Sequence, residues 1–71
     1  MQTIQKAINL YNQKKFSECE NSLKKIIKND PENADAWFYL GLITLNFKKF
    51  DIAISLFNKA IAIKPVLPPY N

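Results

Sequence analysis

The 71-residue sequence contains no histidine and no arginine, and it has one cysteine and one glycine. Without histidine, the Cys–His and Ser–His pairs of nucleophilic catalysis cannot form, and the usual zinc clusters lack a ligand. A single cysteine excludes an intrachain disulfide framework, and one free thiol suits a reducing, intracellular compartment. We therefore expect no cofactor, no bound metal and no enzymatic activity.

Lysine alone supplies the net charge of +4. Nucleic acid recognition relies heavily on the arginine fork, so this excess of lysine is weak evidence for it. The N-terminus lacks a basic flank followed by an apolar stretch, and the longest apolar run, residues 36–43, is too short to span a bilayer. We expect a soluble, cytoplasmic protein with no membrane partner.

What the sequence does contain is a repeat. Residues 12–16 read Asn-Gln-Lys-Lys-Phe, and residues 46–50, which lie 34 positions later, read Asn-Phe-Lys-Lys-Phe. The same offset aligns Pro31 with Pro65 and Ile27 with Ile61. A period of this length indicates stacked helix–turn–helix units, each of which needs a neighbour to bury its apolar face.

Apolar residues recur at helical spacing along the chain and predict four helices. We expect the first around residues 4–11, the second from Phe16 to the Asp30-Pro31 pair, the third over about 34–46 and the fourth over about 50–63. Proline cannot continue a helix, and Asn33 is a suitable N-cap for the third.

Gly41 lies in the middle of the third predicted helix, where glycine costs about 1 kcal/mol relative to alanine. We expect it to face Ala53 and to let two helices approach closely. Ala7 and Cys19, at the equivalent positions 34 residues earlier, are expected to face each other in the same way.

The second unit resembles the tetratricopeptide repeat. The resemblance rests on Trp-Phe-Tyr-Leu-Gly at 37–41, on Ala-Ile-Ser-Leu-Phe at 53–57, and on Ala60 and Pro65. Thr44 stands where the family usually has an aromatic residue. The first unit is a weaker copy, which keeps the family's residues at Ala7, Phe16, Leu23 and Pro31.

The resemblance implies an all-α fold, an α-α superhelix of two stacked antiparallel helix–turn–helix hairpins with four helices. The first hairpin would cover residues 1–33 and the second 34–67, with 68–71 as the run-in to a missing third repeat or a tail. The chain would then be a fragment of a longer repeat protein.

The resemblance also implies a function as a scaffold that binds a helical or extended apolar peptide in a concave groove. The family's chaperone-binding branch grips a carboxylate with polar groups where this sequence has Ile4, Ile8 and Phe38, so we do not expect that activity. Carried over position by position, the groove would be lined by Ile4, Gln5, Ile8, Tyr11, Asn12, Asp35, Phe38, Tyr39, Leu42, Leu45 and Asn46.

The main alternative is self-association without an external ligand. Ile54, Ile61 and Ile63 on the last helix would normally be covered by a further hairpin, and an uncovered apolar patch on a small domain predicts a homo-oligomer.

A lower-ranked alternative is nucleic acid binding by a basic ridge. Lys14, Lys15, Lys48 and Lys49 fall at equivalent turns and would line one edge. We expect no aromatic side chain among these lysines, so base stacking is not implied.

Overall fold

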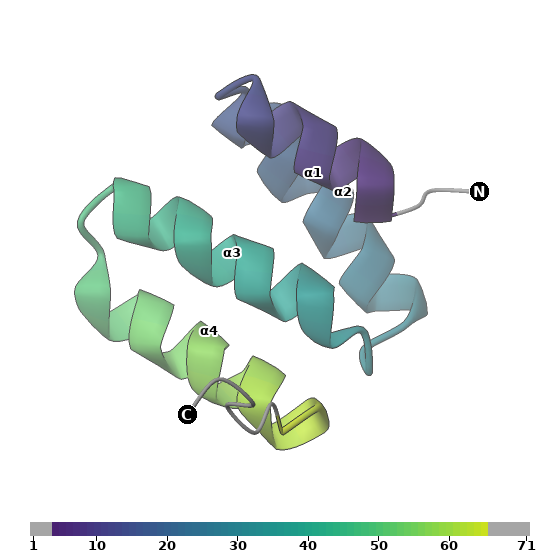
Figure 1. Ribbon diagram of the computed structural model, residues 1–71, viewed down its shortest axis with the longest axis vertical. Helices are drawn as coiled ribbons and strands as arrows, with labels where there is room; N and C mark the ends of the chain where they lie inside the picture. The colour runs from purple at the N-terminus through teal and green to yellow at the C-terminus, as the bar shows by residue number, and fades with distance from the viewer. Residues whose placement is uncertain (1–3, 66–71) are drawn as a thin grey trace, which may run out of the picture.

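The computed structural model describes residues 4–65, which form four helices and no strand (Figure 1). They are α1 (Ile4–Asn12), α2 (Phe16–Asn29), α3 (Ala34–Asn46) and α4 (Phe50–Ile63). Helix α1 packs against α2, α3 packs against α4, and both helices of the first pair contact α3. The predicted all-α fold of helical hairpins is confirmed. Residues 68–71, predicted as a run-in or tail, lie outside the described residues.

The turn between α1 and α2 ends the first helix with a Schellman motif. The backbone N–H of Lys14 donates to the carbonyl of Tyr11, and that of Lys15 donates to the carbonyl of Leu10, both at 2.9 Å. These two bonds satisfy carbonyls that the end of α1 would otherwise leave without a partner.

The turn between α3 and α4 repeats that geometry. Lys48 donates to the carbonyl of Leu45 at 3.0 Å, and Lys49 donates to that of Thr44 at 2.9 Å. Lys48 and its counterpart Lys14 both have φ of 61°, in the left-handed region that favours glycine. The sequence repeat is therefore also a repeat of backbone conformation.

Polar contacts fix the start of α3. The side chain of Asn33 accepts a hydrogen bond from the backbone N–H of Ala36 at 3.1 Å, so the predicted N-cap is confirmed. The indole N–H of Trp37 donates to the carbonyl of Pro31 at 2.9 Å, which ties the first turn of α3 to the α2–α3 connection.

The main hydrophobic core lies between α1, α2 and one face of α3. The thiol of Cys19 is fully buried and donates to the carbonyl of Ala7 at 3.1 Å, so the predicted contact between these two positions is confirmed. The buried members of this core are Ala7, Cys19, Leu23, Ile26, Ala36, Leu40 and Ile43.

The side chain nearest to Gly41 is the ring of Phe57. A β-carbon at this position would lie 2.6 Å from Cε1 of Phe57, and the three atoms nearest to it all belong to that ring rather than to Ala53. Gly41 does permit a close approach of α4, but an aromatic side chain fills the space.

Candidate functional site

The residues predicted to line a groove differ in how far they are exposed. Ile4, Tyr11 and Tyr39 are partly buried and pack against the main core. Ile8 and Leu42 are half-buried, whereas Asn12 is exposed. Three of the predicted groove residues therefore also make contacts within the chain.

Tyr11 and Asn46 join α1 to α3. The side-chain amide of Asn46 donates to the hydroxyl of Tyr11 at 3.0 Å and to the backbone carbonyl of Leu42 at 2.9 Å. The rings of Tyr11 and Tyr39 meet edge to face, with centroids 5.6 Å apart. These contacts hold the C-terminal ends of α1 and α3 together.

The remaining predicted groove residues on α3 are accessible. Phe38 is 44% exposed and Leu45 is 42% exposed, and Asp35 is also exposed. Apolar side chains this exposed on a helix are available to a partner.

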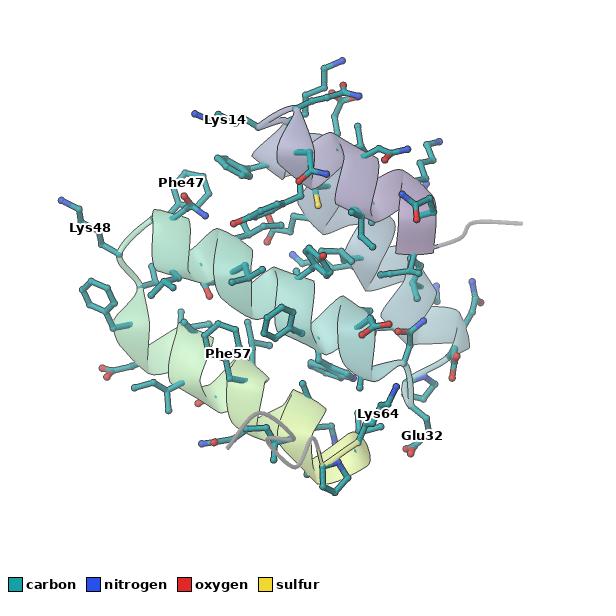
Figure 2. The ribbon with its side chains drawn as sticks, in the orientation of Figure 1. Lys14, Glu32, Phe47, Lys48, Phe57 and Lys64 are labelled. Carbon is teal, nitrogen blue, oxygen red and sulfur yellow. The ribbon has the colours of Figure 1, made fainter. Side chains whose placement is uncertain are left out.

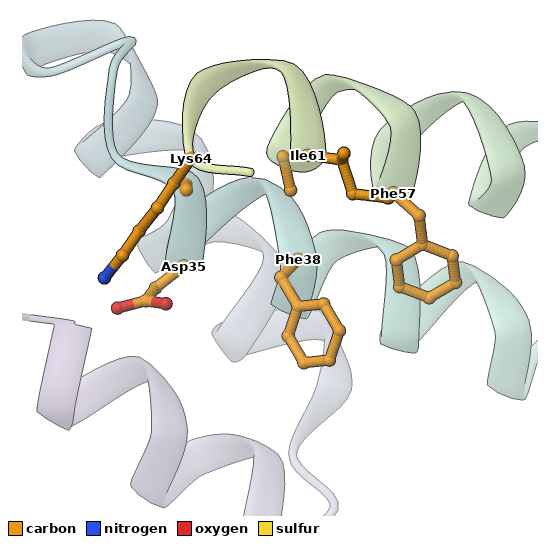
Figure 3. A pocket seen from close by; sticks show the side chains of 7 residues that line it. Asp35, Phe38, Phe57, Ile61 and Lys64 are labelled. Carbon is orange, nitrogen blue, oxygen red and sulfur yellow. The ribbon is translucent and has the colours of Figure 1, made fainter. Parts of the chain in front are cut away.

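Phe38 and Asp35 lie in an open pocket between the N-terminal half of α3 and the C-terminal half of α4, with a volume of about 530 Å³ (Figure 3). The rings of Phe38 and Phe57 form its aromatic wall, with centroids 5.5 Å apart. Asp35 and Lys64 lie together at one end. The lining residues are Ala34, Asp35, Phe38, Phe57, Ala60, Ile61 and Lys64.

The pocket combines two surfaces that the sequence analysis treated as separate. Phe38 was predicted as a groove residue and Ile61 as a self-association residue, yet both line this pocket. Ile61 is 55% exposed, and Ile54 on the same helix is 57% exposed but does not line the pocket. Ile63, the third predicted self-association residue, is half-buried beside the α2–α3 connection.

The 34-residue repeat shows what this pocket corresponds to in the first hairpin. The equivalents of Phe38 and Ile61 are Ile4 and Ile27, and both pack against the main core. The equivalents of Phe57 and Ala60 are Leu23 and Ile26, which are buried in the same core together with three residues of α3, namely Ala36, Leu40 and Ile43. On the first hairpin, this position is therefore occupied by a helix.

Two ionisable side chains line the pocket, and the single thiol is buried in the main core. Within residues 4–65, no group of His, Cys, Asp or Glu side chains could hold a metal ion. Burial raises the pKa of the Cys19 thiol above its ordinary value, so the thiol stays protonated and is a poor nucleophile. The ionisable groups that line the pocket, Asp35 and Lys64, can interact with a charged end of a ligand.

The basic ridge differs from the prediction in one respect. Lys14, Lys48 and Phe47 lie at the same end of the molecule (Figure 2). Phe47 and Phe50 flank the lysine pair of the second turn and are 57% and 55% exposed, so aromatic side chains do lie among these lysines.

Comparison with known proteins supports the repeat assignment. A model of the tetratricopeptide repeat family matches residues 4–68, which is nearly the whole chain. No curated protein and no solved structure matches the sequence. The family match covers both Lys-Lys turns and all four helices of the structure. The chain belongs to the tetratricopeptide repeat family.

Proposed function

We propose that this chain is a protein-interaction module that binds one apolar face of a partner helix in the pocket between α3 and α4. Tetratricopeptide repeats generally mediate protein–protein interactions. We further infer where on this chain the partner binds and which side chains the partner presents.

The observation that carries the proposal is the equivalence between the two hairpins. Leu23 and Ile27 of the first hairpin are covered where α3 packs against α1 and α2, whereas Phe57 and Ile61 at the same positions of the second line an open pocket. A surface whose structural counterpart already holds a helix is well shaped to receive another one. This is the helix-in-groove mode of recognition.

Helix α3 also indicates what the partner should look like. It places Ala36, Leu40 and Ile43 against the first hairpin, so a small residue is followed by two aliphatic ones at spacings of four and three. The larger Phe57 ring in the second hairpin, in place of Leu23, favours a small residue opposite it. Asp35 and Lys64 add polar contacts at one end of the pocket.

The predicted concave groove contributes to this site through Asp35 and Phe38. Tyr11, Tyr39 and Asn46, which were also predicted to bind, contact one another across α1 and α3. We therefore assign them to holding the two hairpins together. Exposed Leu45 and half-buried Leu42 and Ile8 remain available as an extension of the site.

The test is a binding titration with a soluble, labelled helical peptide that presents Ala, Leu and Ile at the spacing found in α3. A peptide with the same composition in scrambled order is the control ligand. We expect saturable binding of the ordered peptide, and a loss of at least about tenfold in affinity with Ile61→Glu, which corresponds to about 1.4 kcal/mol.

A matched control variant is Ile52→Glu, because Ile52 is also an exposed isoleucine of α4, at 50%, and does not line the pocket. It should bind as the wild type does. Equal affinity for the ordered and scrambled peptides, or wild-type affinity of Ile61→Glu, would contradict the proposal.

The exposure of Ile54 and Ile61 favours a second candidate function, self-association through α4. Head-to-tail stacking is disfavoured, because α1 carries exposed Lys6 and Asn9 where α3 carries Leu40 and Ile43. A dimer would therefore be isologous, with the same α4 face on both copies. Sedimentation equilibrium separates the candidates: a dimer is disrupted by Ile54→Glu as well as by Ile61→Glu, whereas peptide binding is lost only with the latter.

A further inference from the structure

A second exposed apolar surface lies at the opposite end of the α3–α4 hairpin from the pocket. Phe47 is 57% exposed, Phe50 is 55% exposed and Ile52 is 50% exposed. Exposed apolar residues scattered singly over a surface are ordinary, but these three lie within six positions around one turn, Phe50 and Ile52 line the same hollow, and we refer to the three as a patch. None of the three lines the pocket between α3 and α4.

Lysines surround this patch from two turns. Lys48 and Lys49 lie between Phe47 and Phe50 in the sequence, and both lysines are exposed. The α1–α2 turn adds the equally exposed Lys14 and Lys15. The two turns are neighbours, because the rings of Phe16 and Phe47 meet edge to face with centroids 5.9 Å apart. We refer to Lys14, Lys15, Phe47, Lys48, Lys49 and Phe50 as the turn edge.

The turn edge is basic, and Lys48, Lys49 and Phe50 line a hollow there together with Asp51 and Ile52. The Schellman geometry at Lys14 and Lys48 makes each lysine pair the tip of a tight turn between two helices. The nearest acidic residues in the sequence are Glu18 and Asp51, in the first turns of α2 and α4. Within residues 4–65, the one salt bridge joins Lys24 to Glu20, so the four lysines of the edge are not neutralised by ion pairs.

We propose that the turn edge docks on the surface of an anionic lipid bilayer. The lysines would contact the anionic headgroups, since basic clusters are attracted to the negative surface potential of such membranes. Phe47 and Phe50 would enter the headgroup region, where partly buried apolar side chains add to electrostatic attraction. None of the helices in the described part of the chain has the length and apolar character needed to cross a bilayer, so the contact is peripheral.

The composition of the turn edge favours a bilayer over single-stranded nucleic acid. Nucleic acid channels combine a basic groove that follows the backbone with aromatic stacking platforms. Here the basic residues are all lysine, and the aliphatic side chain of Ile52 lines the same hollow as Phe50. The expectation of no membrane partner concerned a segment that crosses the bilayer, and a peripheral contact needs none.

The test is co-sedimentation of the full 71-residue chain with vesicles of phosphatidylcholine alone and with about 30 mol% phosphatidylserine. We expect binding only to the anionic vesicles, and its loss as the salt concentration rises from about 0.05 M to about 0.5 M. Lys48→Gln/Lys49→Gln should reduce the bound fraction at least about threefold. The matched control, Lys25→Gln/Lys28→Gln, removes the same charge from exposed positions of α2 and should have little effect.

A second pair of matched variants tests the contribution of the apolar side chains to vesicle binding. Phe50 and Ile61 are both 55% exposed on α4, but only Phe50 belongs to the turn edge. Phe50→Ser should weaken vesicle binding and Ile61→Ser should not. Circular dichroism of each variant confirms that the helices are retained. If a variant unfolds, the orientation of the bound chain, measured by fluorescence quenching, still tests the proposal.

The orientation of the bound chain is measured by fluorescence quenching with brominated acyl chains. Trp37 lies at the N-terminal end of α3, away from the turn edge, and should not be quenched in the wild type. The added tryptophan of Phe50→Trp should be quenched. Equal binding to both vesicle types, equal losses in the two lysine double variants, quenching of Trp37, or binding to a single-stranded oligonucleotide but not to vesicles would each overturn the proposal.

Discussion

The ring of Phe57 occupies the space that a β-carbon on Gly41 would need, since that carbon would lie 2.6 Å from Cε1 and 2.7 Å from Cδ1 of the ring. In the first hairpin the equivalent pair is Ala7 and Leu23, both fully buried. The second hairpin has lost a methyl group on one side and gained a ring on the other. The second hairpin therefore has the smaller residue on its first helix, Gly41, and the larger residue on its second helix, Phe57.

This exchange predicts strong coupling between the two positions. Gly41→Ala should destabilise the fold by about 1–3 kcal/mol, because overpacking outweighs a gain in helix propensity of about 1 kcal/mol. Phe57→Leu makes room for the methyl group and reproduces the pair of the first hairpin, so the double variant should be more stable than Gly41→Ala. Urea unfolding followed by the fluorescence of Trp37 measures all four proteins of the cycle. Stabilisation by Gly41→Ala alone would show that the ring moves aside freely.

The left-handed backbone at the two lysine turns predicts a stabilising substitution. Lys48 has φ of 61°, a conformation that glycine adopts without the steric cost of a β-carbon. Lys48→Gly should be more stable than Lys48→Ala by about 1 kcal/mol, since both variants lose the same charge and only glycine relieves the strain. Lys14→Gly should add a comparable gain. Equal melting temperatures for the glycine and alanine variants would contradict this prediction.

The N-cap of α3 predicts a loss of stability that depends on whether the side chain at position 33 can accept a hydrogen bond. The oxygen of the Asn33 side chain accepts from the backbone N–H of Ala36. Asn33→Ala should therefore lower the free energy of unfolding by about 1 kcal/mol, whereas Asn33→Asp should retain it, because aspartate caps as well and favours the positive end of the helix dipole. Thermal unfolding of the three proteins at one pH provides the comparison.

The sequence predicted the helices well because their signals are local. Pro31 ends one helix, Asn33 begins the next, and apolar residues recur at helical spacing, all within a few residues of the boundaries concerned. The predicted contact of Ala7 with Cys19 is present because the hairpin brings those positions together. The Phe57 ring beside Gly41 was not predicted, because Ala53 and Phe57 lie on the same face of α4 and spacing alone does not show which side chain comes closest.

The candidate site was harder to predict, because it depends on which side chains the first hairpin already covers. The sequence assigned Phe38 and Ile61 to different surfaces, and only the packing of α3 against α4 places them in one pocket. The hydrogen bond between Tyr11 and Asn46 joins residues 35 positions apart and has no local signal. The sequence analysis expected no aromatic side chain among the turn lysines, and the exposure of Phe47 and Phe50 corrects that expectation.

Cys19 predicts a pH dependence of stability at alkaline pH. Burial raises the pKa of its thiol in the folded chain above the ordinary value of 9.0, whereas the thiol of the unfolded chain titrates near that value. Below 9.0 both states hold the proton, and the full contribution of the buried thiol is present. Above 9.0 the unfolded state loses the proton first, so the free energy of unfolding falls as pH rises, by up to about 1.4 kcal/mol per pH unit.

The matched variant is Cys19→Ala, which places in the first hairpin the residue that the second has at Ala53. Urea unfolding of both proteins from about pH 7 to about pH 10 should show a stability difference that shifts toward the alanine variant only above 9.0, because lysine and tyrosine titrations are common to both and cancel. A constant difference over the whole range would mean that the folded thiol ionises as readily as the unfolded one. Alkylation of native Cys19 provides an independent check, because a protonated, fully buried thiol should react only as the chain unfolds.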